Sequence, residues 1–181
     1  AGSQHALAPG LSGPPGVLFA PGEKSSLVVD LDATLNRFLS FASMIIPSND
    51  AFLGNADPTA YDLFDIAGAF KHGFEINLYG ADIWDSGTEL NDGMGAAFST
   101  LGGVSTETSD PIGAHTGLDL FVGTQLPTGE NLMYAFDADT PILRITAERV
   151  PDSGAYLGAL GFLALLGFKL VARNRIARAT R

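Results

Sequence analysis

The stretch DIWDSGTELND, residues 82 to 92, is where residue types and spacing could support chemistry. It holds the carboxylates of Asp82, Asp85, Glu89 and Asp92, and no His, Cys or Lys lies between them. Carboxylates at this density could hold a cation, act as a general acid and base, or form a hydrated turn. The cation site would indicate a binding module, the acid–base pair an enzyme, and the hydrated turn a purely structural loop.

A cation site is the first reading. Calcium takes about six to eight oxygen ligands at roughly 2.3–2.6 Å and accepts irregular geometry. Asp50, Asp85 and Glu89 offer three carboxylates, and Asn49 with nearby carbonyls could complete the shell. We therefore expect the loops at 47–50 and 85–89 to meet at one end of a strand scaffold and share a structural Ca²⁺. The spacing is not that of an EF-hand loop.

Two alternatives stay open for the same residues. In the first, Asp85 and Thr88 cap a turn through side-chain to backbone hydrogen bonds, while Trp84 packs in the core. In the second, an extracellular hydrolase uses two carboxylates on a glycan, and the pairs would be Asp82 with Glu89 or Asp85 with Asp50. The sequence has no Ser-His-Asp order, nucleophile elbow or phosphate loop, and its three histidines are scattered. We therefore expect no enzyme.

Composition restricts the class of protein. The 181 residues suit one ordinary domain with appendages, and 46% hydrophobic with 17% charged residues is typical of a globular or membrane-attached chain. Cysteine is absent, so disulfides are excluded. All 20 acidic residues lie at or before Asp152, whereas half of the 10 basic residues lie in the last 13 positions. An acidic body is a poor partner for phosphate backbones, which excludes nucleic acid binding.

Residues 17–150 are predicted to form an antiparallel all-β domain, a β-sandwich. They follow a flexible Gly/Pro-rich lead-in at 1–16. Residues 74–80 alternate between apolar and polar side chains, as do residues 143–149, which is the period of half-buried strands. Glycine and proline punctuate the rest, as in β turns. The expected strands are 16–20, 26–31, 37–46, 60–66, 74–80, 118–123, 131–138 and 141–150.

The C-terminal part reads as a membrane anchor. After the Val-Pro-Asp-Ser-Gly stretch at 150–154, residues 155–172 hold one charge, Lys169, and as a helix would reach roughly 27 Å, close to the thickness of the bilayer core. The arginines that follow would stay cytoplasmic, so the body would be exported. No signal peptide opens the sequence, so an exported chain would have begun further upstream.

This arrangement of motif, apolar span and Arg-rich end resembles the bacterial PEP-CTERM sorting signals, most closely the VPDSG variant. The resemblance implies export and recognition by an exosortase-like sorting enzyme at 150–154. It also implies cleavage there. The domains expected are then 1–16, 17–150 and 151–181.

Two further motifs resemble the spondin N-terminal domain, over about residues 17–150. They are SMIIPSNDAF, residues 43 to 52, and WDSGTE, residues 84 to 89. The resemblance implies a sandwich related to C2 domains, no catalysis, a calcium site and cell-surface or matrix adhesion. The family's first strand has no counterpart here. We therefore expect an exported binding module whose partner is an extracellular protein or polysaccharide, the glycan hydrolase being the alternative.

Overall fold

The structure is a computed structural model that describes residues 19–96, 103–115, 118–126 and 128–150. The chain divides into two compact units, Ala1–Glu148 and Arg149–Arg181. The predicted lead-in at 1–16 and the predicted membrane span at 155–172 lie outside the described residues, as does all of the sorting motif except Val150. No helix within the described ranges is long and apolar enough to cross a bilayer.

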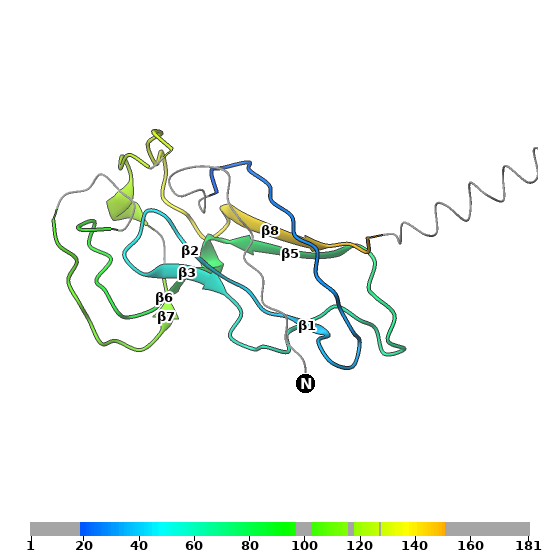
Figure 1. Ribbon diagram of the computed structural model, residues 1–181. Helices are drawn as coiled ribbons and strands as arrows, with labels where there is room; N and C mark the ends of the chain where they lie inside the picture. Colours follow the sequence, from blue (N-terminus) through cyan, green and yellow to red (C-terminus); the bar gives the residue numbers. More distant parts are fainter. Residues whose placement is uncertain (1–18, 97–102, 116–117, 127, 151–181) are drawn as a thin grey trace, which may run out of the picture. The chain divides into compact units, whose positions relative to one another are not determined.

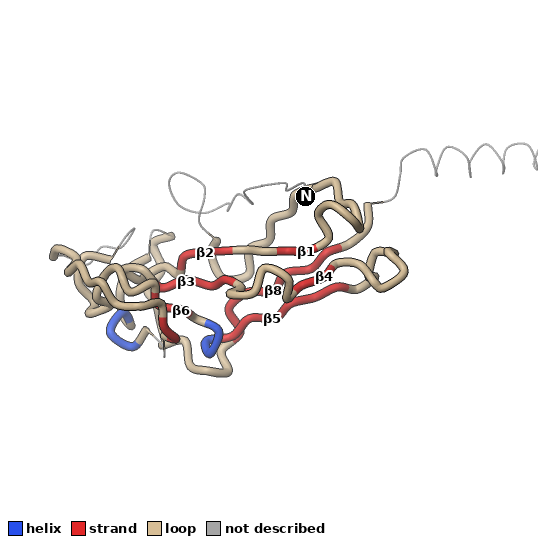
Figure 2. Tube along the Cα trace, turned by 90° about the horizontal axis from the view of Figure 1, so that it is seen from below, coloured by secondary structure: helices blue, strands red, loops and turns tan. Residues whose placement is uncertain are grey.

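The described residues form an all-β, antiparallel fold, as predicted (Figure 1). One sheet has the order β2-β3-β6-β7, and two ribbons pair β1 with β4 and β5 with β8. Loops make up most of the remaining chain, with two short 3-10 turns, η1 and η2 (Figure 2). The elements are β1 Phe38–Leu39, β2 Ala42–Met44, β3 Ala51–Gly54, β4 Tyr61–Asp62, β5 Phe74–Tyr79, η1 Gly80–Asp82, β6 Trp84–Asp85, β7 Gly113–Ala114, η2 Asp119–Phe121 and β8 Pro141–Ala147.

The longest ribbon confirms the predicted alternation. In β5, Ile76 and Leu78 are each 6% exposed, whereas Glu75 and Asn77 face solvent. The partner strand β8 pairs Ile145 with Ile76 in antiparallel register. Strand residues alternate between two faces, so one face of this ribbon is apolar and the other polar.

One hydrophobic cluster joins the ribbon to the four-stranded sheet. Leu53 of β3 is 2% exposed and belongs to the same core as Ile76 and Leu78 of β5. The loops complete this core. Its buried members are Ile45, Ala51, Leu53, Ile76, Leu78, Ile83, Ala96, Leu118, Phe121 and Leu132.

Two of the predicted strands have another structure. The stretch 118–123 contains η2 instead, because Leu118 and Phe121, three residues apart, are both 1% exposed, a spacing that a helical turn buries on one side. Residues 131–138 contribute a single bridge, from Asn131 to Gln125. Met133 and Tyr134 beyond it are exposed.

Other predicted strands are shorter than expected or missing. The predicted strand at 37–46 is divided into β1 and β2, and that at 60–66 keeps the two residues of β4 with a bridge at Phe64. Residues 26–31 form no strand, and of the stretch 16–20 the described part, Phe19 and Ala20, is not strand either. Side-chain pattern alone predicted these strands, whereas a strand also needs a neighbour to bond to its backbone.

Candidate functional site: the Asp50 network

The first predicted loop is a tight connection between β2 and β3. The Ile45 N–H donates to the Ala51 carbonyl at 2.9 Å, which closes the loop at its base. Inside it, the fully buried Ser48 hydroxyl donates to the Ile45 carbonyl at 2.6 Å and accepts from the Ala51 N–H at 3.1 Å. These bonds satisfy backbone groups that burial would otherwise leave unpaired. They also fix Asn49 and Asp50 at the entrance to β3.

The second predicted loop follows β6, which pairs with β3 so that Asp85 lies opposite Ala51. The Asp85 Oδ1 accepts from the Gly87 N–H at 2.8 Å, an Asx turn, as one alternative predicted for Asp85. The Thr88 hydroxyl, which the same alternative assigned to a backbone bond, instead donates to the side chain of Asp50. Gly87 has φ +74°, and a Cβ there would lie 2.1 Å from the Asp110 carbonyl oxygen. Glycine is the residue that tolerates both conditions.

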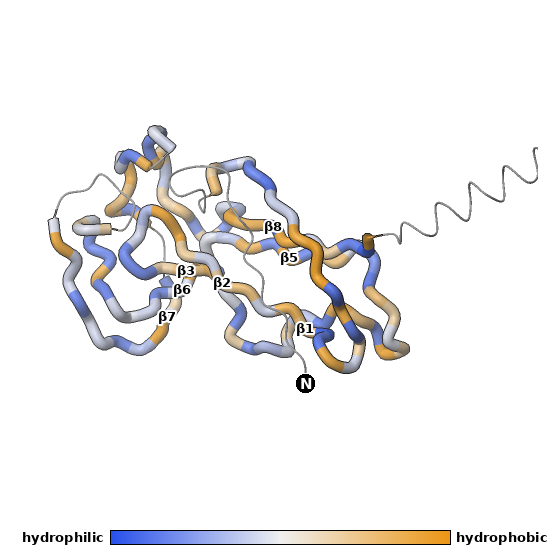
Figure 3. The backbone as a smooth tube through the Cα atoms, viewed as in Figure 1, coloured by the Kyte–Doolittle hydropathy of each residue, from blue (hydrophilic) through white to orange (hydrophobic). Residues whose placement is uncertain are grey.

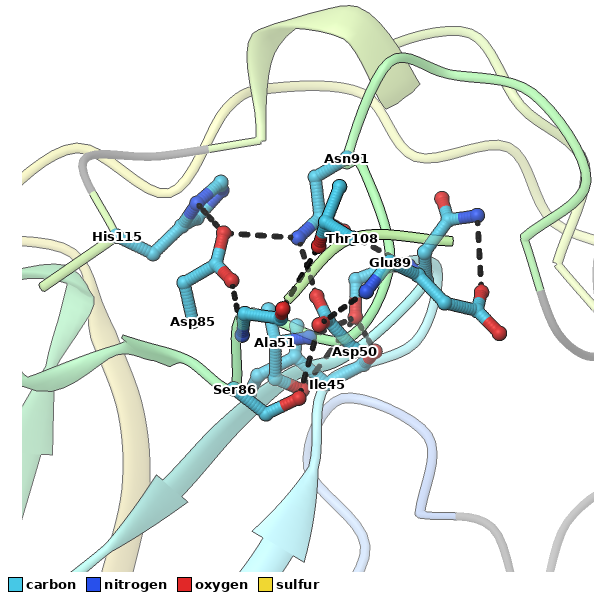
Figure 4. A network of polar contacts seen from close by, with 12 residues as sticks. Ile45, Asp50, Ala51, Asp85, Ser86, Glu89, Asn91, Thr108 and His115 are labelled. Atoms are coloured by element: carbon cyan, nitrogen blue, oxygen red, sulfur yellow. Dashed lines mark hydrogen bonds and ion pairs between the residues drawn. The ribbon is translucent and has the colours of Figure 1, made fainter. Parts of the chain in front are cut away.

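The two loops meet at the carboxylate of Asp50, which accepts five hydrogen bonds from the second loop (Figure 4). Its Oδ2 accepts from Ser86 Oγ at 2.8 Å, Thr88 N at 2.7 Å, Thr88 Oγ1 at 3.0 Å and Glu89 N at 2.9 Å. Its Oδ1 accepts from Asn91 Nδ2 at 2.7 Å. We call Asp50, Ser86, Thr88, Glu89 and Asn91 the Asp50 network.

These contacts decide the charge of Asp50. Burial alone raises the pKa of its carboxyl, because it penalises the ionised form. Hydrogen bonds from the Glu89 N–H, the Ser86 hydroxyl and the Thr88 N–H and hydroxyl outweigh burial, so the pKa lies below its ordinary value. Asp50 is therefore ionised at neutral pH, and the loop supplies donors in place of a counter-ion.

Asn91 links Asp50 to the second predicted ligand. Its Nδ2 donates to Asp50 Oδ1 and, at 3.2 Å, to Asp85 Oδ2. The amide orientation is fixed because Asn91 Oδ1 accepts from the Asn49 backbone N–H at 2.8 Å, and a backbone N–H can only donate. An NH₂ group therefore bridges the two carboxylates. On the other side of Asp85, His115 Nδ1 lies 3.6 Å from Oδ2.

Glu89, the third predicted ligand, contributes its backbone to the network but not its carboxylate. Its Oε2 lies 3.4 Å from Asn49 Nδ2, a long contact. Asn49 is 6% exposed, and its Nδ2 also donates to the Met94 carbonyl at 2.9 Å. Its Oδ1 has no hydrogen-bond partner among the described residues. The Glu89 side chain thus contacts Asn49. It does not join the carboxylates of Asp50 and Asp85 (Figure 4).

As arranged, these residues do not form a cation cage. Calcium needs oxygen lone pairs directed at one point, whereas the Asn91 NH₂ occupies the bridging position between Asp50 and Asp85. Within the described part of the chain, no group of three or more His, Asp or Glu side chains is disposed to hold a metal ion. Calcium at Asp50, Asp85 and Glu89 therefore stays a prediction, and it requires the Asn91 side chain to turn away.

The structure brings one carboxylate pair of the hydrolase alternative together. Asp50 and Asp85 lie close together with Asn91 between them. Asp82 Oδ2 instead accepts from the Tyr79 N–H at 2.8 Å, which caps η1. Trp84, predicted in the core, lies in β6 and is partly exposed.

Asn91, Ser86 and His115 were not predicted as site residues. Carboxylates were predicted as ligands for a cation, whereas the hydroxyls and the amide of the same stretch act as donors to a carboxylate. The signal was present, since Ser86, Thr88 and Asn91 lie among the acids in the same stretch. No protein-family model, curated protein or solved structure matches the chain.

Proposed function

We propose that this chain is an exported binding module of the cell surface or extracellular matrix. In this proposal residues 17–150 form a spondin-type β-sandwich, and residues 151–181 supply a sorting motif, a transmembrane helix at 155–172 and a basic tail. The observation that carries it is the Asp50 network, in which the two motifs resembling spondin domains hold each other. Asp50 of the first motif and Ser86 and Thr88 of the second serve to position the two loops.

The core supports the sandwich. Leu53 of the four-stranded sheet and Ile76 and Leu78 of the β5–β8 ribbon belong to one apolar cluster. Two antiparallel layers that bury apolar faces against each other are the arrangement of a sandwich. The loops that follow β2 and β6 then lie together at one rim, where a partner could contact them.

The state of Asp50 argues against this residue as the acid of a hydrolase. A glycosidase needs a carboxylic acid whose pKa is raised, so that it holds a proton at working pH. Five donors surround Asp50, and its pKa is lowered. A carboxylate in this environment is a poor proton donor.

The proposal includes a structural calcium ion at Asp50, Asp85 and Glu89. Because Asn91 bridges two of these carboxylates, calcium must displace a hydrogen-bonded amide, and we expect weak affinity. A calorimetric titration with calcium, repeated on Asp85→Ala, tests the ion. Absence of binding heat in the unmodified protein rejects calcium and leaves the rest of the proposal unaffected.

Export is tested by fractionating cells that express the full-length protein, together with the mass of its C-terminal peptide. We expect the protein outside the cytoplasm, with a C-terminus created near Ser153. A cytoplasmic protein that ends at Arg181 contradicts the proposal. Retention on extracted matrix, without turnover of glycan substrates, separates the binding module from the hydrolase.

A further inference from the structure

The predicted strand at 26–31 is an extended stretch with exposed apolar side chains. It is blue in Figure 1 and largely orange, the colour of hydrophobic residues, in Figure 3. Every residue from Lys24 to Asp32 is exposed. Leu27, Val28, Val29 and Leu31 are 42%, 77%, 38% and 37% exposed. Soluble proteins rarely leave so many neighbouring apolar side chains in contact with water.

The backbone is open in the middle of this stretch, whereas the Asp30 carbonyl accepts from Asn36 Nδ2 at 3.0 Å. Within the described part of the chain, no hydrogen bond involves the backbone of Leu27, Val28 or Val29. Valine and leucine side chains favour the extended conformation over turns. An extended backbone with free N–H and C=O groups is a template for another strand.

The sequence of the stretch complements itself. When two copies run antiparallel with Val28 on the twofold axis, Leu27 of each copy faces Val29 of the other. In the same register Lys24 of each copy faces Asp32 of the other, so the symmetric pair contains two opposite-charge contacts. If the twofold axis passes through Leu27 instead, Val28 and Val29 lie opposite serines. If it passes through Val29, Val28 lies opposite Asp30.

We propose that residues 24–32 form an antiparallel strand pair between two copies of this chain, with Val28 at the twofold axis. Opposite apolar and opposite charged residues stabilise antiparallel pairs, and a symmetric contact of this kind closes as a dimer. The contact is small, so the pairing belongs to the weak class of interfaces. It depends neither on export nor on calcium.

Cysteine cross-linking tests the pairing on the full chain, because the protein contains no cysteine of its own. Residues opposite each other in an antiparallel pair lie close enough for a disulfide. Under mild oxidation we expect Val28→Cys to form a disulfide-linked dimer several-fold faster than Ile66→Cys or Val104→Cys, which place the thiol at exposed positions elsewhere. Equal rates at the three positions overturn the proposal.

Charge reversal tests the register. In the Val28→Cys background, Lys24→Glu places like charges opposite each other and should slow cross-linking several-fold. Lys71→Glu makes the same change in net charge outside the stretch and should leave the rate unchanged. If both substitutions have the same effect, or neither has any, the Lys24–Asp32 register is wrong and the proposal fails.

Discussion

The Asp50 network allows one precise test, the substitution Asp50→Asn. Asparagine has nearly the same shape but presents one acceptor oxygen and one NH₂ group. If the amide oxygen takes the place of Oδ2, the four hydrogen bonds that Oδ2 accepted are then made to a neutral group and become weaker. The new NH₂ then faces the Asn91 NH₂, the donor that lies 2.7 Å from Oδ1 in the native protein.

The expected loss in the free energy of unfolding follows from these contacts. A hydrogen bond to an ionised group contributes about 1.5–3 kcal/mol and a neutral one about 0.5–1.5 kcal/mol, so each of the four loses roughly 1 kcal/mol. The donor–donor contact adds a similar loss. Asp50 is partly exposed, and water can replace part of what is lost, which halves the sum to about 2–3 kcal/mol.

Urea unfolding of the chain ended after Glu148, where the first compact unit ends, measures the loss. With a slope of about 1–3 kcal/mol per molar for small proteins, the midpoint should fall by roughly 1–2 M. Asp92→Asn is the matched control, because Asp92 accepts one bond, from the Met94 N–H at 2.9 Å, and asparagine can make the same turn. If both variants unfold at the native midpoint, the network does not hold the loops together.

Three further predictions concern the same region. Asn91→Asp replaces the bridging NH₂ by a third carboxylate, so the variant should be destabilised without calcium and recover with it, which thermal unfolding with and without EDTA would detect. Gly87→Ala should cost several kcal/mol and Gly73→Ala about 1 kcal/mol, because both have positive φ but only Gly87 has a carbonyl oxygen 2.1 Å from the added Cβ; comparable losses would refute the role of that contact. A lowered folded-state pKa gives Asp50 a stabilising effect that is present above its unfolded pKa of about 4 and is lost as pH falls through the folded value. Asp50→Asn should therefore flatten the acid limb of the stability curve, and an unchanged slope would contradict this.

The all-β class and the most strongly patterned strands could be predicted from local sequence. The alternation in 74–80 gave β5 with its buried Ile76 and Leu78, because a period of two places alternate residues on opposite faces whatever the partner. The strand expected at 26–31, from an apolar run between turn residues, is not formed, and every residue there is exposed. Alternation describes a strand's faces, whereas its hydrogen bonds depend on a neighbour that the local sequence does not specify.

The candidate site divides in the same way. The acidic residues and their two loops were visible in the sequence, since carboxylates spaced along a Gly-Thr turn stand out in any chain. The sequence did not indicate which groups stabilise the negative charge of Asp50. Pairing of β3 with β6 places the Ser86–Asn91 loop beside Asp50, and the fixed orientation of the Asn91 amide makes that loop a set of donors. The sequence thus determined which charges exist, and the tertiary structure decided that backbone and amide N–H groups surround them, because those groups come from residues 36 to 41 positions away.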